Sequence, residues 1–263
     1  MKESKLFNSQ IFAASVTGLL VILATPQIGL TQTSPSQMTL TGTLRDFKAY
    51  RNTSGNIDPN GHPDFERKPG TDKNPAGQFF NYGLDPNITT NTISSDKKPV
   101  YKDGSYSTTN QTNFDQWYRD VAGVNQSMSY PITLNYDSSS KKYIYEDNSF
   151  FPIDNQLFGN QGRTHNYHFT YAINSQFTYQ GGETFKFIGD DDVWVYINGQ
   201  KVVDLGGVHS ANTGSVTLDT AKAQQLGLQV GKTYDFDFFF AERHTTESHF
   251  RIETTLAFVT LPD

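Results

Sequence analysis

The sequence FKFIGDDDVWVYINGQKVVDL, residues 185–205, decides the fold. Its apolar residues alternate with polar or opposite-facing neighbours at Phe185, Phe187, Val193, Val195 and Ile197. This period of two predicts two short strands around a corner at residues 189–192. Asn198-Gly199 then predicts a tight hairpin, because both central residues of a type I′ turn need positive φ. The corner is therefore expected at a strand end, next to a hairpin.

The corner itself holds three consecutive carboxylates, Asp190, Asp191 and Asp192. Adjacent carboxylates repel one another and Asp is a poor strand former, so this run opposes folding unless a cation neutralises it. A hard cation that takes oxygen ligands fits such a corner, and Ca²⁺ is the predicted occupant. The alternative is a solvated acidic turn.

Composition points to one β-rich domain. The chain has 263 residues, of which 14% are aromatic and 18% charged, and its formal net charge is −6. Abundant Phe and Tyr, together with loops rich in Gly, Asn and Thr, indicate strands with aromatic faces. The negative charge and the lack of a Lys/Arg cluster argue against binding to nucleic acid or to an anionic membrane surface.

The N-terminus has the pattern of an exported protein. Lys2 and Lys5 precede an apolar stretch at residues 11–24 that is too short for a comfortable transmembrane helix. We predict a secretory signal peptide and short polar linker at 1–33, one domain at 34–263, and no membrane span after signal removal; an uncleaved anchor is the alternative. Either way, the folded part is expected to be secreted or at the cell surface. The chain has no cysteine, so any extra staple there would be a metal ion such as Ca²⁺.

The rest of the pattern predicts an all-β sandwich or barrel with two short helical inserts and long loops. Alternation predicts further strands at 38–44, 132–136, 143–145, 168–177, 234–240 and 250–258. One helix is predicted around Phe114, Trp117, Tyr118 and Val121, spaced i, i+3, i+4, i+7, with Thr112 or Asn113 as its N-cap. The other is predicted at 219–226, with Gly227 as its stop.

Residues 46–113 contain few apolar runs and many Asn, Asp, Gly, Pro and Ser, which predicts a long loop region. Loops of this length in a compact domain are usually functional or held by their own side chains. Phe65, Phe79, Phe80 and Tyr82 are the predicted anchors of this region.

A second loop, residues 241–249, follows a strand with a buried Phe face and is predicted to meet the acidic corner. Glu242 is predicted to complete an oxygen cage with Asp190 and Asp191. Arg243 and His244 are expected to bond to the hydroxyls of a ligand. Asp192 and Thr246 complete the predicted ligand-binding set. The alternative for Arg243 is an exposed ion pair with Glu247.

No catalytic set is found. The six His residues show no zinc spacing, and no nucleophile elbow, P-loop or dinucleotide fingerprint occurs. A glycoside hydrolase needs two acids facing a cleft, which adjacent Asp residues in one turn do not supply. Asn56-x-Asp58-x-Asn60-Gly61 resembles half of an EF-hand loop, but Arg67 stands where the closing Glu belongs. A plain Asn/Gly turn is therefore predicted near residues 56–64, with a second calcium site as the alternative.

Several ordered motifs resemble a known family. They are GTLRDF at 42–47, HPDFE at 62–66, GDDDVWVYING at 189–199, VVDLGGVH at 202–209 and FFFAERH at 238–244. Together they look like the fibro-slime domain, a variant of the PA14 β-barrel, over about residues 39–256. PA14 modules of yeast flocculins and bacterial adhesins bind sugars through Ca²⁺, held by two consecutive Asp residues joined by a cis peptide and by a second loop.

The resemblance implies that Asp190 and Asp191 are the matching pair, joined by a cis peptide. Asp192 stands where many members have Gly, and Glu242 stands where the flocculin type has Asn. An additional carboxylate would tighten calcium and leave fewer positions for sugar hydroxyls.

Two functions follow as expectations. The first is a secreted or cell-surface, non-enzymatic, Ca²⁺-dependent adhesion module that binds extracellular or cell-surface polysaccharide. The second is a structural protein of the extracellular matrix, in which calcium only stabilises the fold and binding is to protein or to itself.

Overall fold

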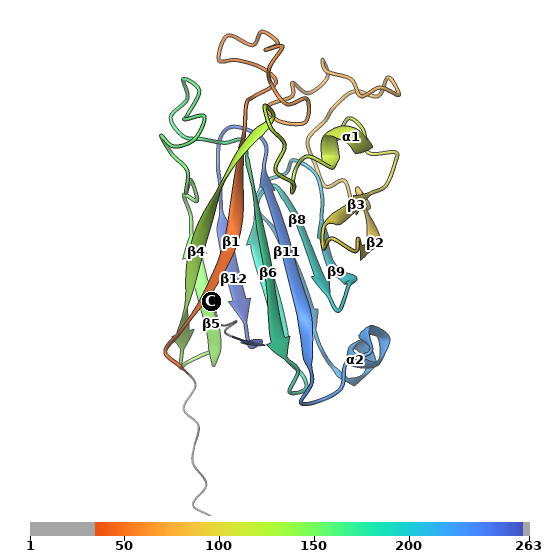
Figure 1. Ribbon diagram of the computed structural model, residues 1–263, viewed down its shortest axis with the longest axis vertical. Coiled ribbons are helices and arrows are strands. Elements are labelled where there is room, and N and C mark those ends of the chain that lie inside the picture. The colour runs from red at the N-terminus through yellow and green to blue at the C-terminus, as the bar shows by residue number, and fades with distance from the viewer. Residues whose placement is uncertain (1–34, 260–263) are drawn as a thin grey trace, which may run out of the picture. The chain divides into compact units, whose positions relative to one another are not determined.

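The computed structural model describes residues 35–259, and the predicted signal peptide lies outside this range. Within it, thirteen strands form one sheet (Figure 1). The strands are β1 (Gln37–Phe47), β2 (Thr89–Ile93), β3 (Pro99–Tyr101), β4 (Asn125–Asp137), β5 (Lys142–Asp147), β6 (Phe169–Thr178), β7 (Thr184–Gly189), β8 (Asp192–Ile197), β9 (Gln200–Leu205), β10 (Asn212–Thr217), β11 (Thr233–Glu242), β12 (Phe250–Thr254) and β13 (Ala257–Phe258). The predicted all-β class is confirmed.

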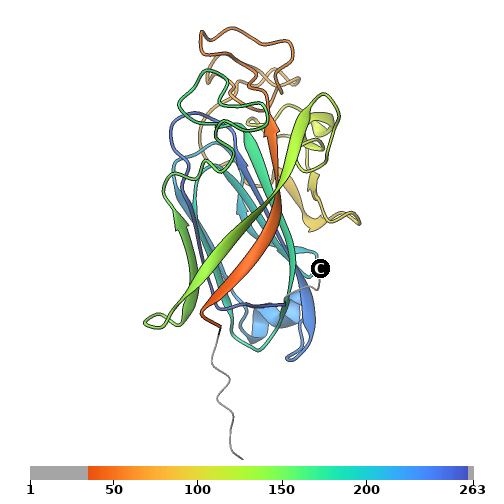
Figure 2. The same ribbon diagram turned by 60° about the vertical axis from the view of Figure 1, so that its left-hand side comes forward.

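The sheet is antiparallel and curls on itself. Its order is β10-β7-β12-β5-β4-β1-β6-β11-β8-β9-β2-β3, with β13 paired to β6. Figure 2 shows the curl from the side. β10, at one end of the order, returns to β9: a Cβ on Gly214 would lie 2.4 Å from Val203 Cγ1. The two strands therefore pack against each other without a backbone ladder, as in an incompletely closed barrel.

The interior of the curl is filled mainly by aromatic rings. In β7, residues Phe185 and Phe187 point inward, and in β11 the same face carries Phe236, Phe238 and Phe240. Phe187 lies 5.6 Å from Phe238, centroid to centroid. This face is the one that the alternating sequence predicts, because side chains in a strand point alternately to opposite faces.

The outer face of the central strands is buried as well, although the sequence pattern predicts no cover for it. All six residues of β8 are buried, including Trp194 and Tyr196 on the outer face. A second apolar cluster covers them, with Phe47, Phe65, Phe114, Trp117 and Tyr118 among its members. The segments before β4 thus form a cap over the sheet.

Two helices are present in the described range, as predicted. α2 (Thr220–Leu226) has Asp219 as N-cap and ends at Gly227 in the left-handed conformation, which confirms the prediction for this helix. α1 (Gln111–Phe114) is shorter than predicted, and its N-cap is Asn110, not Thr112 or Asn113. The Trp117 amide bonds to the Phe114 carbonyl, so the chain continues in tighter turns.

The prediction of one long loop region at residues 46–113 is partly wrong. This region contains the short strands β2 and β3. Phe65 and Phe80 are buried anchors, as predicted. Phe79 and Tyr82 are not anchors: their side chains are 50% and 47% exposed.

The strand directions gather the functional loops at one end. β9 and β11 run in the same direction, because both are antiparallel to β8. β7 also runs in this direction, because neighbouring strands alternate in direction along the sheet order from β7 to β11. Their C-terminal ends therefore lie at the end of the sheet that also carries the long loops, at the top of Figure 1. The acidic corner and residues 242–249 meet there.

Candidate functional site

The acidic corner begins where β7 has no room for a side chain. A Cβ on Gly189 would lie 2.1 Å from the His249 carbonyl oxygen on β12's side, so only glycine allows this approach. The following peptide bond, between Asp190 and Asp191, is cis, as predicted. Both side chains are buried, at 3% and 5% exposure, which excludes the solvated acidic turn.

Backbone amides from two other loops orient these carboxylates. Asp191 accepts hydrogen bonds from the amides of His209 and Arg243, both at 3.1 Å. Asp190 accepts one from the amide of His249 at 2.6 Å. The corner therefore joins the loop after β9 and the loop between β11 and β12.

Glu242, the last residue of β11, completes a cluster of buried acids. It is 1% exposed, and its Oε2 has no hydrogen-bond partner of normal geometry among the described residues, although the Ser248 hydroxyl and the His244 amide lie near enough to lower the pKa of the carboxyl. Burial and the charges of Asp191 and Asp190 raise the pKa of Glu242 well above its ordinary value. Burial, followed by the charge of Asp192, likewise raises the pKa of Asp191.

The carboxylates of Asp190, Asp191 and Glu242 are donors of the kind that a hard divalent cation takes, but the described group of three whose ligand atoms lie within 4.8 Å of one another is Asp190, Glu247 and His249. Between residues 35 and 259, no Lys or Arg side chain forms an ion pair with Asp190, Asp191 or Glu242. A buried carboxylate oxygen without a partner is costly, and three neighbouring acids multiply the cost. Carboxylates are the ligands that Ca²⁺ prefers, so these residues would hold it.

Asp192 and Arg243 have a different role from the predicted one. Both side chains are fully buried, and Arg243 donates to Asp192 through Nε at 2.5 Å and Nη2 at 3.1 Å. A fully buried pair has no surface to offer a ligand. The predicted ligand contacts of both residues, and the exposed Arg243–Glu247 ion pair, are therefore wrong.

Arg243 instead positions the site. Its Nη1 donates to the Ser107 carbonyl at 2.6 Å, and its guanidinium lies 4.8 Å from the Trp117 ring centroid. It thereby ties the cap segments to the corner, while its own backbone amide holds Asp191. Asp192 Oδ1 accepts a hydrogen bond from the Gly207 amide at 2.6 Å, which ties the loop after β9 to the same pair.

A cavity of about 370 Å³ opens onto this corner. Asp190 and Asp191 line it, together with the predicted ligand-binding residues His244 and Thr246. Tyr82 also lines it, and its hydroxyl lies 2.8 Å from His244 Nε2. Tyr82 is not among the predicted ligand-binding residues, because its place in the long loop region predicts a buried ring.

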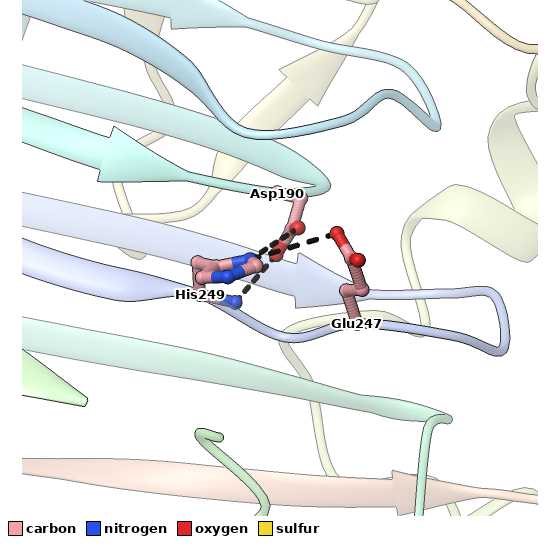
Figure 3. Close-up of side chains that lie close together, drawn as sticks. All are labelled: Asp190, Glu247 and His249. Carbon is pink, nitrogen blue, oxygen red and sulfur yellow. Dashed lines mark hydrogen bonds and ion pairs between the residues drawn. The ribbon is translucent and has the colours of Figure 1, made fainter. Parts of the chain in front are cut away.

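A second group of polar side chains borders the same corner (Figure 3). Asp190 Oδ2 lies 3.1 Å from His249 Nδ1, and Glu247 Oε2 lies 4.0 Å from that nitrogen. One possible ligand atom from each of the three lies within 4.8 Å of the others. No spacing in the sequence indicates this group, because His249 reaches Asp190 only through the pairing of β12 with β7.

The half EF-hand pattern forms ordinary turns. Asp58 Oδ1 accepts a hydrogen bond from the Asn60 amide at 2.8 Å, and Asn56 and Asn60 are exposed. An Asx turn of this kind uses the carboxylate locally.

The comparisons with known proteins agree with the predicted family. Residues 139–261 match the family model described as the PA14 domain. This range includes the acidic corner and the loop between β11 and β12. The PA14 resemblance is thereby confirmed for this part of the chain, and the fibro-slime assignment stays a prediction.

Relatives occur in Dictyostelium discoideum. The protein psiR is 38% identical over 242 residues, which is 86% of this chain and 22% of psiR. The protein psiC is 39% identical over 187 residues, or 65% of this chain and 35% of psiC. The protein psiH is 58% identical over 116 residues, or 41% of this chain and 16% of psiH. The chain thus spans about a third or less of the length of these curated relatives.

Solved structures give more distant matches. A PA14 sugar-binding domain from an RTX adhesin is 13% identical, with a TM-score of 0.29 over 84% of this chain and 94% of that one. An Epithelial Adhesin A domain from Candida glabrata, in complex with β-lactose, is 13% identical with a TM-score of 0.30, over 86% and 91% of the two chains. Separately, no helix between residues 35 and 259 is long and apolar enough to cross a membrane.

Proposed function

We propose that this chain, which carries a PA14 domain, is a non-enzymatic module that binds carbohydrate through Ca²⁺ outside the cell. Asp190, Asp191 and Glu242 hold the ion. Hydroxyls of an extracellular or cell-surface polysaccharide complete its coordination from the cavity. His244 and Thr246, on the cavity wall, contact the sugar.

The observation that carries this proposal is the unpartnered Oε2 of Glu242. Native proteins rarely leave a buried carboxylate oxygen without a donor, because the desolvation cost is then not recovered. Here two more buried carboxylates lie close enough to raise its pKa further. A divalent cation would neutralise this cluster, and backbone amides hold two of its carboxylates, Asp190 and Asp191, in place.

The position of the ion makes it available to a ligand. Asp190 and Asp191 line the cavity, whereas Glu242 does not. The cavity volume falls in the range of roughly 300–1,000 Å³ that is typical of small-molecule sites. Glycosidase chemistry needs two acids facing a substrate cleft across several ångströms, and the buried position of Glu242 argues against that role.

The calcium site is tested by calorimetric titration of Ca²⁺ into the full chain. We expect one binding event in the parent protein and its loss in Asp190→Ala and in Asp191→Ala. Asp103→Ala, at an exposed loop carboxylate, is the control that leaves binding unchanged. A tight single-site signal that survives in both corner variants would remove the corner as the site.

The carbohydrate function is tested on a glycan array, with calcium and again with chelator. Binding that requires calcium and disappears in Asp191→Ala supports the proposal. Calcium that binds and stabilises the protein without any glycan signal would instead support the structural role, with protein or a second copy as partner.

A further inference from the structure

We propose that the carbohydrate is anionic, and that a basic cleft beside the calcium cavity binds its carboxylate or sulfate group. This inference rests on the proposed function, because the cleft continues the cavity in which calcium would hold the sugar. It adds a second binding subsite next to the calcium cavity and specifies that the ligand carries negative charge.

The two hollows are neighbours with a shared wall. Tyr82, His244 and Thr245 line both the calcium cavity and a cleft of about 470 Å³. An oligosaccharide held at one therefore reaches the other along these three residues. Each hollow by itself is within the size range of a small-molecule site.

The charge of the cleft is opposite to that of the calcium corner. Four basic residues line it, Arg51, Arg67, Lys68 and Arg163, against one acid, Glu66. Glu66 is already engaged: its Oε2 lies 2.9 Å from His168 Nε2 and 3.8 Å from Arg163 Nε. This excess of positive charge is notable in a chain whose net charge is −6.

Two of the four basic residues, Arg67 and Lys68, form no ion pair with a described residue, although Arg67 lies 5.3 Å from the Phe80 ring centroid and near the charges of Asp64 and Asp72. Arg51 donates to Asp72 and Arg163 faces Glu66, which neutralises both. Arg67 is only 2% exposed, and its Nη1 has no hydrogen-bond partner among the described residues. The exposed side chain of Lys68 forms no ion pair within residues 35–259.

The exposed Lys68 ammonium is the group that can contact an anion, and the buried Arg67 guanidinium adds to the positive potential of the cleft. The low dielectric around a buried charge strengthens this potential. The shared chemistry is thus an anionic substituent on a sugar, either a carboxylate or a sulfate.

Tyr82 separates the two subsites and offers a flat apolar surface between them. Its ring is 47% exposed, and contacts with His244 and with Phe80 at 5.0 and 5.8 Å, centroid to centroid, hold it in place. A fixed, exposed aromatic ring is suited to stacking against the apolar face of a sugar ring.

The test uses the full chain on an array of carboxylated, sulfated and matched neutral oligosaccharides, in calcium. We expect the anionic glycans to bind more strongly, and the comparison of carboxylated with sulfated members identifies the group. Lys68→Glu is expected to raise the dissociation constant for the best anionic glycan about fivefold or more. This difference between variant and parent is expected to shrink as the salt concentration rises. Its affinity for Ca²⁺ is expected to stay within about twofold, since the corner is untouched.

Lys232→Glu is the matched control. It makes the same charge change at an exposed lysine next to the start of β11, roughly 30 Å from Glu242 at the other end of that strand. A preference for neutral glycans, or equal losses in the two variants, would overturn the basic cleft. Anionic glycans that bind without calcium but still depend on Lys68 would uphold the cleft and overturn the calcium role. Absence of any glycan binding would overturn both.

Discussion

Asp190, Asp191 and Asp192 are chemically identical neighbours, yet the structure gives them different tasks. Asp190 and Asp191 accept backbone amides and face the cavity. Asp192 turns inward and pairs with Arg243, where neither side chain touches solvent. Removing one partner of such a buried pair is costly, so this pair is a structural element behind the site. The role of each Asp therefore depends on the direction of its side chain and not on its residue type.

At Glu242, the cage hypothesis predicts opposite effects with and without calcium. In chelator, Glu242→Gln removes one of three mutually repelling buried acids and is expected to stabilise the fold by about 1–3 kcal/mol. With calcium, the same change weakens ion binding, because an amide oxygen carries no charge. We also expect the loss of affinity to be smaller than in Asp191→Ala, since one oxygen ligand remains. Thermal unfolding in chelator and in calcium, with calorimetry, measures both effects.

The contrast between conditions is what separates a metal site from a structural network. If Glu242→Gln destabilises the protein equally in chelator and in calcium, Glu242 is held by contacts other than an ion. Unchanged calcium affinity would place Glu242 outside the coordination shell.

Asp46 provides a pH-dependent prediction away from the metal site. Its carboxyl is fully buried and accepts hydrogen bonds from the Phe158 amide and from Asn166 Nδ2. Burial, which outweighs these bonds, raises the pKa of Asp46 from 3.8 to about 7. The folded state therefore holds a proton that the unfolded state releases between about pH 4 and 7. Its contribution to stability is complete below pH 4 and is lost as the pH rises through 7.

Urea unfolding at pH 4, 5, 6 and 7 checks this sign. Asp46→Asn cannot titrate, so the free energy of unfolding of the parent, relative to this variant, is expected to fall steadily across that range. Asp103→Asn, at an exposed carboxylate, controls for the general effect of losing an acid. Parallel pH profiles for the parent and Asp46→Asn would contradict the prediction.

At the scale of elements, local patterns predicted the strands well. The alternation in β7 and β8 and the Asn198-Gly199 turn reflect requirements that act within a few residues, and both appear where expected. The prediction failed where a strand is buried on both faces. Trp194 and Tyr196 are covered by the cap around Phe65 and Trp117, and no local pattern reports what will lie on a strand's second face.

The helical insert shows the same limit. Phe114, Trp117 and Tyr118 are buried as their spacing suggests, but the helix ends at Phe114. A stretch this short is marginal as a helix, and packing against the sheet decides its path. The periodicity identified the buried side chains correctly and the backbone conformation only in part.

The candidate site was predictable to the extent that it rests on strand ends. Asp190 and Asp191 follow the end of β7 and Glu242 ends β11, and the charges of the first two raise the pKa of Glu242. As a metal cage, the three residues stay a prediction. Arg243 was misplaced because a residue one step past a strand end points inward or outward according to tertiary contacts, here with Asp192 and Ser107. Tyr82 was missed for a related reason, since exposure in a long loop has no signature in composition.

At the scale of the whole described fold, the proposed ion would join segments that are far apart in sequence. The corner after β7, the loop after β9 and the end of β11 already share hydrogen bonds around Asp191. There is no disulfide to hold them, because the chain contains no cysteine. A cation at this point would act as a cross-link between three loops at one end of the sheet.

The last prediction follows from that geometry. Calcium at a hundredfold excess over its dissociation constant is expected to add about 2.7 kcal/mol to the free energy of unfolding. For a domain of this size, that corresponds to a rise in melting temperature of roughly 5–10 °C.

Hydrogen exchange is expected to show which segments the ion stabilises. Chelator should accelerate exchange in residues 189–192, 206–209 and 242–249, and leave α2 and the hairpin at residues 198–199 unchanged, because they lie at the opposite ends of β11 and β8. Uniform acceleration over the sheet would mean that calcium acts on global stability alone, and no change at either end would mean that the three buried acids at this corner hold no ion.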